Sequence, residues 1–319
     1  MLRKVLSHAG HMPGKIPRCS AIRLTSSLSL ATWERAAQLP GVLNLAVGQP
    51  AHGLLPSTSV QQAALRLSEF DARHLLQYGS SAGSVHYLEA VGSFLSAELG
   101  YTVDSSNLFA TPGNSGGLAL VTRTLTRPGD TVLMEEPSYF LAHQVFRDYK
   151  CNFLQIHHRA DGAGTLDIDA LAALLWRVRY LSTTTADMVM PQLLYCVPTG
   201  NNPTGRTMPD ADRARLVQLC AEYGVTIIAD DVYEMLQWCG AGEGSEPMPL
   251  RWHAQQQGLG ATVISLGSWS KILGPGLRLG WVEAEPELLK SLSCDGEVES
   301  FIHHFHSPSL ALPRLPCNV

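Results

Sequence analysis

The sequence predicts an α/β domain built around a largely parallel sheet. Short apolar runs, some of them rich in β-branched residues, alternate with segments whose apolar residues recur at helical spacing. Strands of a parallel sheet read as continuous apolar runs because helices cover both faces of the sheet. Hydrophobic residues make up 45% of the 319 residues and charged residues 16%, a balance that supports a sizeable core and is not typical of disorder.

Six apolar runs are expected to form the strands, and further segments are expected to be helices or loops. The strands in chain order are Asn107–Thr111, Thr131–Met134, Leu193–Val197, Val225–Asp230, Thr262–Leu266 and Leu277–Val282. Helical spacing marks Val85–Leu99, Leu118–Leu125, Ile168–Trp176 and Asp210–Tyr223, the last following a proline of the kind common at helix starts. Tyr180–Pro191 and Gly240–Pro249 are expected to be loops, and no long helix or strand is expected after Glu283–Leu292.

Charge and cysteine content exclude several classes of protein. With 23 basic and 28 acidic residues, the net charge of −5 argues against binding nucleic acid. No apolar run approaches the ~20 residues of a membrane span. The 7 cysteines form no CxxC pair, so neither a disulfide scaffold nor a zinc ribbon is expected and a reducing, cytoplasmic setting is the default. The alternative is mitochondrial, since the first 33 residues contain no acid and carry five lysines and arginines.

The segment Ser265–Trp281 holds the most informative lysine. Lys271 follows an apolar strand and lies among hydroxyls and glycines. A neutral lysine amine can attack a carbonyl and form a Schiff base. Ser268, Ser270 and Arg278 add hydroxyl and guanidinium donors that suit a phosphate. Alone, a lysine beside serines is more often a surface lysine, so the interpretation depends on the other motifs.

Three further segments place polar groups after expected strands. Asp230 ends a strand at the edge where open α/β sheets bind ligands. It could pair with a protonated ring nitrogen, and Tyr233 could donate to the same ligand. The alternative is an acidic residue that only caps the transition from strand to loop. The turn Pro198–Gly205 could present an asparagine amide to a ring oxygen, although such turns are common. Thr111–Leu118 is a glycine-rich turn that opens a helix and suits an anion, but it lacks the GxGxxG spacing of dinucleotide sites.

Together, these four segments and their order resemble the class I/II aminotransferases of pyridoxal-phosphate fold type I, in particular the aromatic and 2-aminoadipate/kynurenine aminotransferase branch. The resemblance covers about residues 25–292 and rests on the run Ser268-x-Ser-Lys-x-x-x-x-Gly-Leu-Arg-x-Gly, with Asn-Pro-Thr-Gly and Asp-x-x-Tyr upstream. It implies a three-layer large domain with a mostly parallel sheet, pyridoxal 5′-phosphate as cofactor, and a homodimer. It also implies transfer of an amino group between an α-amino acid and a 2-oxo acid.

The resemblance assigns roles to twelve residues. Lys271 matches the lysine that binds the cofactor covalently and moves the substrate proton, and Asp230 matches the carboxylate that keeps the pyridine nitrogen protonated. Asn202 and Tyr233 match the donors to the ring oxygen, Tyr233 counting with Lys271 and Asp230 as catalytic. The matches to the phosphate donors are Ser268, Ser270, Arg278, Asn114 and Ser115. Tyr139 matches the residue that stacks on the ring, and Tyr78 matches the tyrosine that reaches the phosphate of the neighbouring subunit. Gly48, together with Asn202, matches a position near the substrate.

Two departures from the family pattern limit what the resemblance implies. Asn114-Ser115-Gly116 stands where relatives more often have Ser-Gln-Gln. The expected domains are an N-terminal arm at 1–42, the cofactor-binding large domain at 43–285, and a truncated or aberrant remnant of the small domain at 286–319, so that the small domain is largely missing. The only arginine after Arg278 is Arg314, which matches no family motif, so no carboxylate-binding arginine is assigned. His303, His304 and His306 lack companion ligands, and no metal is expected.

Two alternatives to an active transaminase remain open. One is a truncated, non-catalytic homologue that only binds the cofactor or pairs with a full-length subunit. The other is the cofactor-sensing half of a transcription regulator, although the N-terminal arm is too short for a winged-helix domain. The amino acid and the oxo acid are not identified by the sequence.

Overall fold

The computed structural model describes residues 48, 50–71, 77–160, 165–184, 189–237 and 246–295. The chain divides into two compact units, Met1–Ala51 and His52–Val319, and the fold described below is that of the second. The expected arm at 1–42 and the histidine cluster near residue 304 lie outside the described residues. Within the described part of the chain, none of the helices combines the length and apolar character needed to cross a bilayer.

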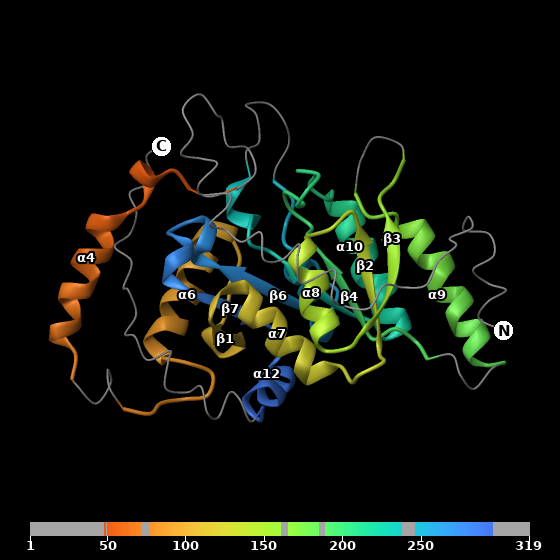
Figure 1. The fold of residues 1–319 in the computed structure, drawn as a ribbon, viewed down its shortest axis with the longest axis horizontal. Helices are drawn as coiled ribbons and strands as arrows, with labels where there is room; N and C mark the ends of the chain where they lie inside the picture. The colour runs from red at the N-terminus through yellow and green to blue at the C-terminus, as the bar shows by residue number, and fades with distance from the viewer. Residues whose placement is uncertain are drawn as a thin grey trace, which may run out of the picture. The chain divides into compact units, whose positions relative to one another are not determined.

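The second unit contains a seven-stranded sheet with the order β1-β7-β6-β5-β4-β2-β3 (Figure 1). The strands are β1 (Leu108–Thr111), β2 (Thr131–Glu136), β3 (Asn152–His157), β4 (Leu193–Cys196), β5 (Thr226–Asp230), β6 (Val263–Ser268) and β7 (Gly280–Glu283). The five strands from β6 to β3 are parallel to one another, and only β7 runs antiparallel to both of its neighbours. The expectation of a mostly parallel sheet is confirmed.

Helices cover both faces of this sheet, which makes the domain three-layered. The described helices of the unit are α4 (Ser57–Arg66), α6 (Val85–Leu99), α7 (Gly113–Leu125), α8 (Phe140–Asp148), α9 (Ile168–Ser182), α10 (Asp210–Tyr223), α11 (Leu250–Gln256) and α12 (Pro286–Ser293). One core joins α7, α8 and α12 to one face, and a second joins α9, α10 and α11 to the opposite face.

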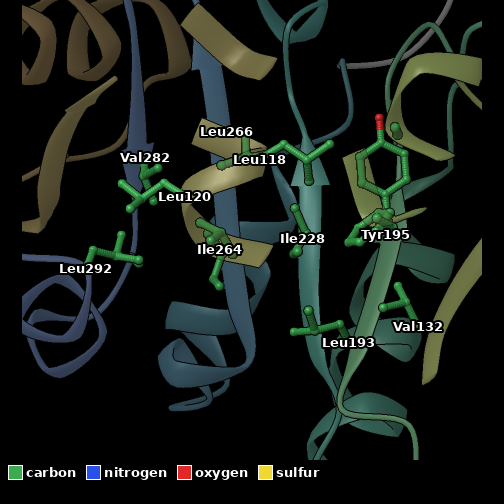
Figure 2. Close-up of a cluster of buried hydrophobic side chains, with 14 of the residues drawn as sticks. Leu118, Leu120, Val132, Leu193, Tyr195, Ile228, Ile264, Leu266, Val282 and Leu292 are labelled. Atoms are coloured by element: carbon green, nitrogen blue, oxygen red, sulfur yellow. The ribbon is translucent and has the colours of Figure 1, made fainter. Parts of the chain in front are cut away.

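Side-chain alternation along the strands feeds these two cores. Successive residues of a strand point to opposite faces. In β4, Leu193 and Tyr195 therefore belong to the first core, whereas Leu194 and Cys196 belong to the second. Figure 2 shows Leu118 and Leu120 of α7 among the side chains of the first core. Burial on both faces explains why these strands read as continuous apolar runs.

The structure departs from the sequence expectations at several elements. β3 was not expected, and neither were α4, α8 and α11. The expected strand at 277–282 begins only at Gly280, because residues Pro275–Leu277 form a short 3₁₀ helix and Arg278 has a left-handed backbone with φ of 51°. Within the expected loop at 180–191, α9 continues to Ser182.

Candidate active site

A cavity of about 200 Å³ lies where several strands end. Val197 follows β4, Asp230 is the last residue of β5, and Ser268 is the last residue of β6. The carboxyl ends of parallel strands meet at one edge of a sheet, which is where open α/β sheets bind ligands. Ten of the twelve predicted site residues line this cavity: Asn114, Ser115, Tyr139, Asn202, Asp230, Tyr233, Ser268, Ser270, Lys271 and Arg278.

The start of α7 forms one wall of the cavity. β1 ends at Thr111, and Gly113 begins the helix with a positive φ of 75°. A Cβ atom at Gly113 would lie only 2.8 Å from Nη2 of Arg278, so a side chain at this position would displace the guanidinium. Asn114 and Ser115 follow in the first turn, whose backbone N–H groups have no partner within the helix. This arrangement suits an anion.

Arg278 is held beside that helix start by backbone contacts. Its Nη2 donates to the carbonyl of Pro112 at 2.9 Å, and its Nη1 lies 3.4 Å from the carbonyl of Pro275. The left-handed backbone of Arg278 is costly for a residue with a side chain. Such conformations gather at ligand-binding sites, where the surrounding structure holds them in place.

Lys271 ends a 3₁₀ turn, Trp269–Lys271, that directly follows β6. Ser268 Oγ accepts from the backbone N–H of Ser270 at 3.1 Å and donates to Ser270 Oγ at 2.9 Å. The buried indole of Trp269 anchors the turn, since its Nε1 donates to Tyr87 Oη at 3.1 Å. The lysine Nζ lies 5.9 Å from the centroid of the Tyr233 ring. The amine therefore faces the phenol, with the serine hydroxyls close by in sequence.

Asp230 carries a buried carboxylate with one committed oxygen. Tyr195 Oη donates to Asp230 Oδ2 at 2.6 Å, and Figure 2 shows the Tyr195 hydroxyl pointing toward the carboxyl ends of the strands. The other oxygen, Oδ1, is buried and has no hydrogen-bond partner of good geometry among the described residues. Burial raises the pKa of Asp230 to about 6, and the hydrogen bond from Tyr195 opposes this rise, with smaller contributions from the Val232 backbone and the Asn114 side chain. The carboxylate of the cofactor-free chain is thus ionised above that pH.

Tyr233 and Asn202 form a pair of donors at the cavity. Burial raises the pKa of Tyr233, the charge of Asp230 adds to the rise, and a hydrogen bond with Asn202 opposes it. The phenol is therefore protonated at neutral pH and can donate. Tyr139, half-buried at the same cavity, also has its pKa raised by burial.

Glu135 supports the loop that carries Asn202. Its Oε1 accepts from the backbone N–H of Val197 at 2.6 Å and from Asn201 Nδ2 at 2.7 Å, and its Oε2 lies 3.3 Å from His158 Nε2. Sequence reasoning did not single out Glu135 or Tyr195. Glu135 could have been found, because an acid near the end of an apolar strand indicates a site residue, as it does at Asp230. Tyr195 lies inside a strand, and a tyrosine there gives no such indication.

Two predicted site residues do not line the cavity. Tyr78 has a side chain that is 69% exposed. Gly48 is exposed and belongs to the unit of residues 1–51. Their roles, like those of the ten residues at the cavity, remain predictions.

The residues present fit pyridoxal 5′-phosphate. Asp230 Oδ1 is a buried acceptor that a protonated ring nitrogen would satisfy. The start of α7, the two serines and Arg278 offer donors for a phosphate, and Lys271 offers an amine for the aldehyde. The buried Asn114 Oδ1 in the cavity wall also has no hydrogen-bond partner among the described residues.

Comparisons with known proteins find relatives of this chain among aminotransferases. The chain is 33% identical over 258 residues to 2-aminoadipate transaminase of Thermus thermophilus, and the aligned region covers 81% of this chain and 59% of the relative. It is 30% identical over 251 residues to aromatic-amino-acid aminotransferase 1 of Thermococcus litoralis, covering 79% of this chain and 56% of the relative. The chain thus spans less than two thirds of the length of either protein.

A solved structure and a family model extend the comparison. The structure of LysN, alpha-aminoadipate aminotransferase, from Thermus thermophilus, complexed with N-(5′-phosphopyridoxyl)-L-leucine, has a TM-score of 0.67 and 30% identity, covering 88% of this chain and 67% of that one. The model for aminotransferase class I and II matches residues 40–313. The chain therefore belongs to the class I and II aminotransferase family, whose cofactor is pyridoxal 5′-phosphate.

Proposed function

We propose that this protein is a pyridoxal-phosphate-dependent transaminase that moves an amino group between an α-amino acid and a 2-oxo acid. One observation carries the proposal: the amine of Lys271 and the buried carboxylate of Asp230 line a single cavity of about 200 Å³. The residues that we expect to bind the phosphate line the same cavity. A lone lysine, a lone acid or a lone glycine-rich turn would not make this case.

The cavity residues divide into three groups by the part of the cofactor they would hold. The start of α7 with Asn114, Ser115, Ser268, Ser270 and Arg278 would bind the phosphate. Asp230 Oδ1 would accept the hydrogen bond of the ring nitrogen. Asn202 and Tyr233 would donate to the ring oxygen, with Tyr139 against the ring face.

The chain's own groups then supply the proton transfers. When bound, the cofactor supplies an aldehyde for Schiff-base chemistry and a protonated ring that withdraws electrons from the substrate α-carbon. Lys271 Nζ would supply the amine for the aldehyde, and as a free amine it would take the substrate α-proton and deliver it to the cofactor carbon, not back to the α-carbon. Proton transfer by a placed base is typically worth ~10²–10⁴-fold in rate. The ionised carboxylate of Asp230 would keep the proton on the ring nitrogen.

The names of the relatives suggest the substrates to test first. One relative is named for aromatic amino acids, and a second relative and a solved structure, both from Thermus thermophilus, are named for aminoadipate, so we propose amino donors from these two groups. A 2-oxo acid such as 2-oxoglutarate would accept the amino group. Among the described residues, the cavity lining holds a single arginine, Arg278, which is assigned here to the phosphate.

We also propose that the protein works as a homodimer. Tyr78 is 69% exposed and Leu65 is 74% exposed, so apolar side chains of the second unit lie at its surface. A partner subunit would cover such residues and receive the Tyr78 phenol at its phosphate site. Light scattering would test the dimer. The proposed compartment is the cytoplasm, with the mitochondrion as the alternative because of the acid-free N-terminus.

The decisive experiment traps the lysine. The purified chain is incubated with pyridoxal 5′-phosphate, reduced with borohydride, digested, and analysed by mass spectrometry for a phosphopyridoxyl lysine. We expect the label on Lys271 and its loss in Lys271→Ala. Lys290→Ala is the matched control, because Lys290 is an exposed lysine paired with Glu287 and should not affect the label.

The second stage tests amino transfer. Tyrosine, phenylalanine, kynurenine and 2-aminoadipate are added to the loaded protein, and the oxo acid released in a single turnover is measured. A label on another lysine would refute the site. A label on Lys271 with no oxo acid from any donor would refute the transaminase and favour the non-catalytic homologue.

A further inference from the structure

The two donors to the ring oxygen come from different segments of the chain. Asn202 lies in the turn after β4, whereas Tyr233 lies in the turn after β5. Two donors can reach one ligand atom only if these turns keep a constant distance from each other. The structure contains a buried polar link between them, made of Thr199, Glu234 and Arg213.

Thr199 stands at the centre of this link. Its Oγ1 accepts from Arg213 Nη2 at 2.6 Å and donates to Glu234 Oε2. The exposed fractions are 2% for Thr199, 4% for Glu234 and 0% for Arg213, so water does not replace these contacts. Thr199 precedes Asn202 in one turn, and Glu234 directly follows Tyr233 in the other.

Arg213 donates hydrogen bonds to both ends of the turn that carries Asn202. Its Nε donates to the carbonyl of Met208 at 2.9 Å, and its Nη2 lies 3.3 Å from the carbonyl of Pro198. Pro198 and Met208 are the two ends of the segment that carries Asn202, and they are joined by a backbone hydrogen bond of 2.7 Å. Arg213 Nη1 also donates to Glu234 Oε1 at 3.2 Å. The three side chains therefore connect both turns to α10.

We propose that Thr199 is a positioning residue whose hydroxyl couples the two turns and so keeps Asn202 and Tyr233 aimed at one ligand atom. The inference rests on the proposed function, in which that atom is the ring oxygen of pyridoxal 5′-phosphate. A hydroxyl is required because it accepts from the guanidinium and donates to the carboxylate at the same time. An apolar group of the same shape would leave both charged partners short of one contact.

The test compares Thr199→Val with Thr199→Ser. Valine keeps the shape and removes the hydroxyl, whereas serine keeps the hydroxyl. The readouts are the dissociation constant of pyridoxal 5′-phosphate and the pH midpoint of the visible absorption band of the bound cofactor. Donors to the ring oxygen stabilise its negative charge. A displaced donor would therefore raise the pH at which the proton shared between that oxygen and the nitrogen of Lys271 is lost. We expect Thr199→Val, which removes both hydrogen bonds of the hydroxyl, to weaken cofactor binding about tenfold and to raise the midpoint. Thr199→Ser should match the wild type.

A double-mutant cycle separates positioning from a purely structural role. In an Asn202→Ala/Tyr233→Phe background, Thr199→Val should add little further change in the pH midpoint, because the hydroxyl acts through these two donors. Equal shifts in both backgrounds would overturn the proposal. Thr199→Ala, which introduces no methyl group where the hydroxyl was, is the second variant if valine prevents folding, and thermal melting reports folding in each case.

The outcomes distinguish this proposal from the proposed function. If the wild-type chain carries no cofactor on Lys271, the proposed function fails and the coupling fails with it. If the wild type carries the cofactor and Thr199→Val has the wild-type affinity and midpoint, only the role of Thr199 is overturned.

Discussion

Replacing Asp230 by asparagine should stabilise the cofactor-free protein at alkaline pH. The folded protein raises the pKa of Asp230 from 3.8 to about 6, chiefly through burial. At about 1.4 kcal/mol for each pH unit, keeping this carboxylate ionised costs the folded state about 3 kcal/mol at pH 8. Asparagine is neutral and of similar size, and its amide oxygen can still accept from Tyr195 Oη.

The sign of the effect follows from the protons bound. Between pH 3.8 and about 6, folded Asp230 holds a proton that the unfolded chain has lost. The free energy of unfolding of the wild type therefore falls as pH rises through this window and stays lowered above it. The asparagine variant lacks this fall, so the stability gap should be near zero below pH 4 and reach roughly 3 kcal/mol at pH 8.

Urea unfolding of both proteins, followed by circular dichroism at pH 4 and pH 8 without cofactor, measures this gap. Asp169→Asn is the control of opposite sign, because Arg215 lowers the pKa of the exposed Asp169 and that variant should lose a little stability at pH 8. Added pyridoxal 5′-phosphate should raise the melting temperature of the wild type much more than that of Asp230→Asn. An asparagine variant less stable than the wild type at pH 8, or a gap independent of pH, would refute the reasoning.

Two further substitutions test the neighbouring groups. Tyr195→Phe removes the donor to Asp230 Oδ2, a hydrogen bond to a charged group typically worth ~1.5–3 kcal/mol, so the pKa of Asp230 should rise further above about 6. The affinity for pyridoxal 5′-phosphate, measured by absorbance titration, should then fall more at pH 6.5 than at pH 9, and an equal loss at both would contradict the assignment. Gly113→Ala should cost ~1–2 kcal/mol of folding stability, because its φ is 75°, and should also weaken cofactor binding by displacing Arg278. Gly129→Ala, at a φ of 99° with open space around it, is the control that should lose stability in urea but keep the affinity.

Elements with a strong local signal were predicted well from the sequence. α6 and α10 have the predicted bounds, and β5 begins one residue later than expected. Elements with a weak local signal were missed. β3 is an edge strand that pairs only with β2 and is partly exposed, so it lacks the continuous apolar run of the inner strands. α8 and α11 are short, with nine and seven residues, too few for helical spacing to be distinctive.

The same distinction holds at the site. Lys271, the serines and Arg278 stand within one short segment, so the sequence alone groups them. Tyr195, Glu135 and Arg213 were not predicted, because each supports a residue that is distant in sequence. The bond from Tyr195 to Asp230 spans 35 positions, and that from Asn201 to Glu135 spans 66.

The sequence by itself determined which reactive groups the chain carries and which local turns present them. These are a lysine amine, an aspartate side chain at the end of a strand, and a glycine-rich helix start. Only the tertiary structure decided that these groups share one cavity, with one oxygen of Asp230 committed to Tyr195 and the other left without a partner among the described residues. The physical reason is that the carboxyl ends of β4, β5 and β6 meet at one edge of a parallel sheet, and pairing between strands is a long-range property that no local pattern encodes.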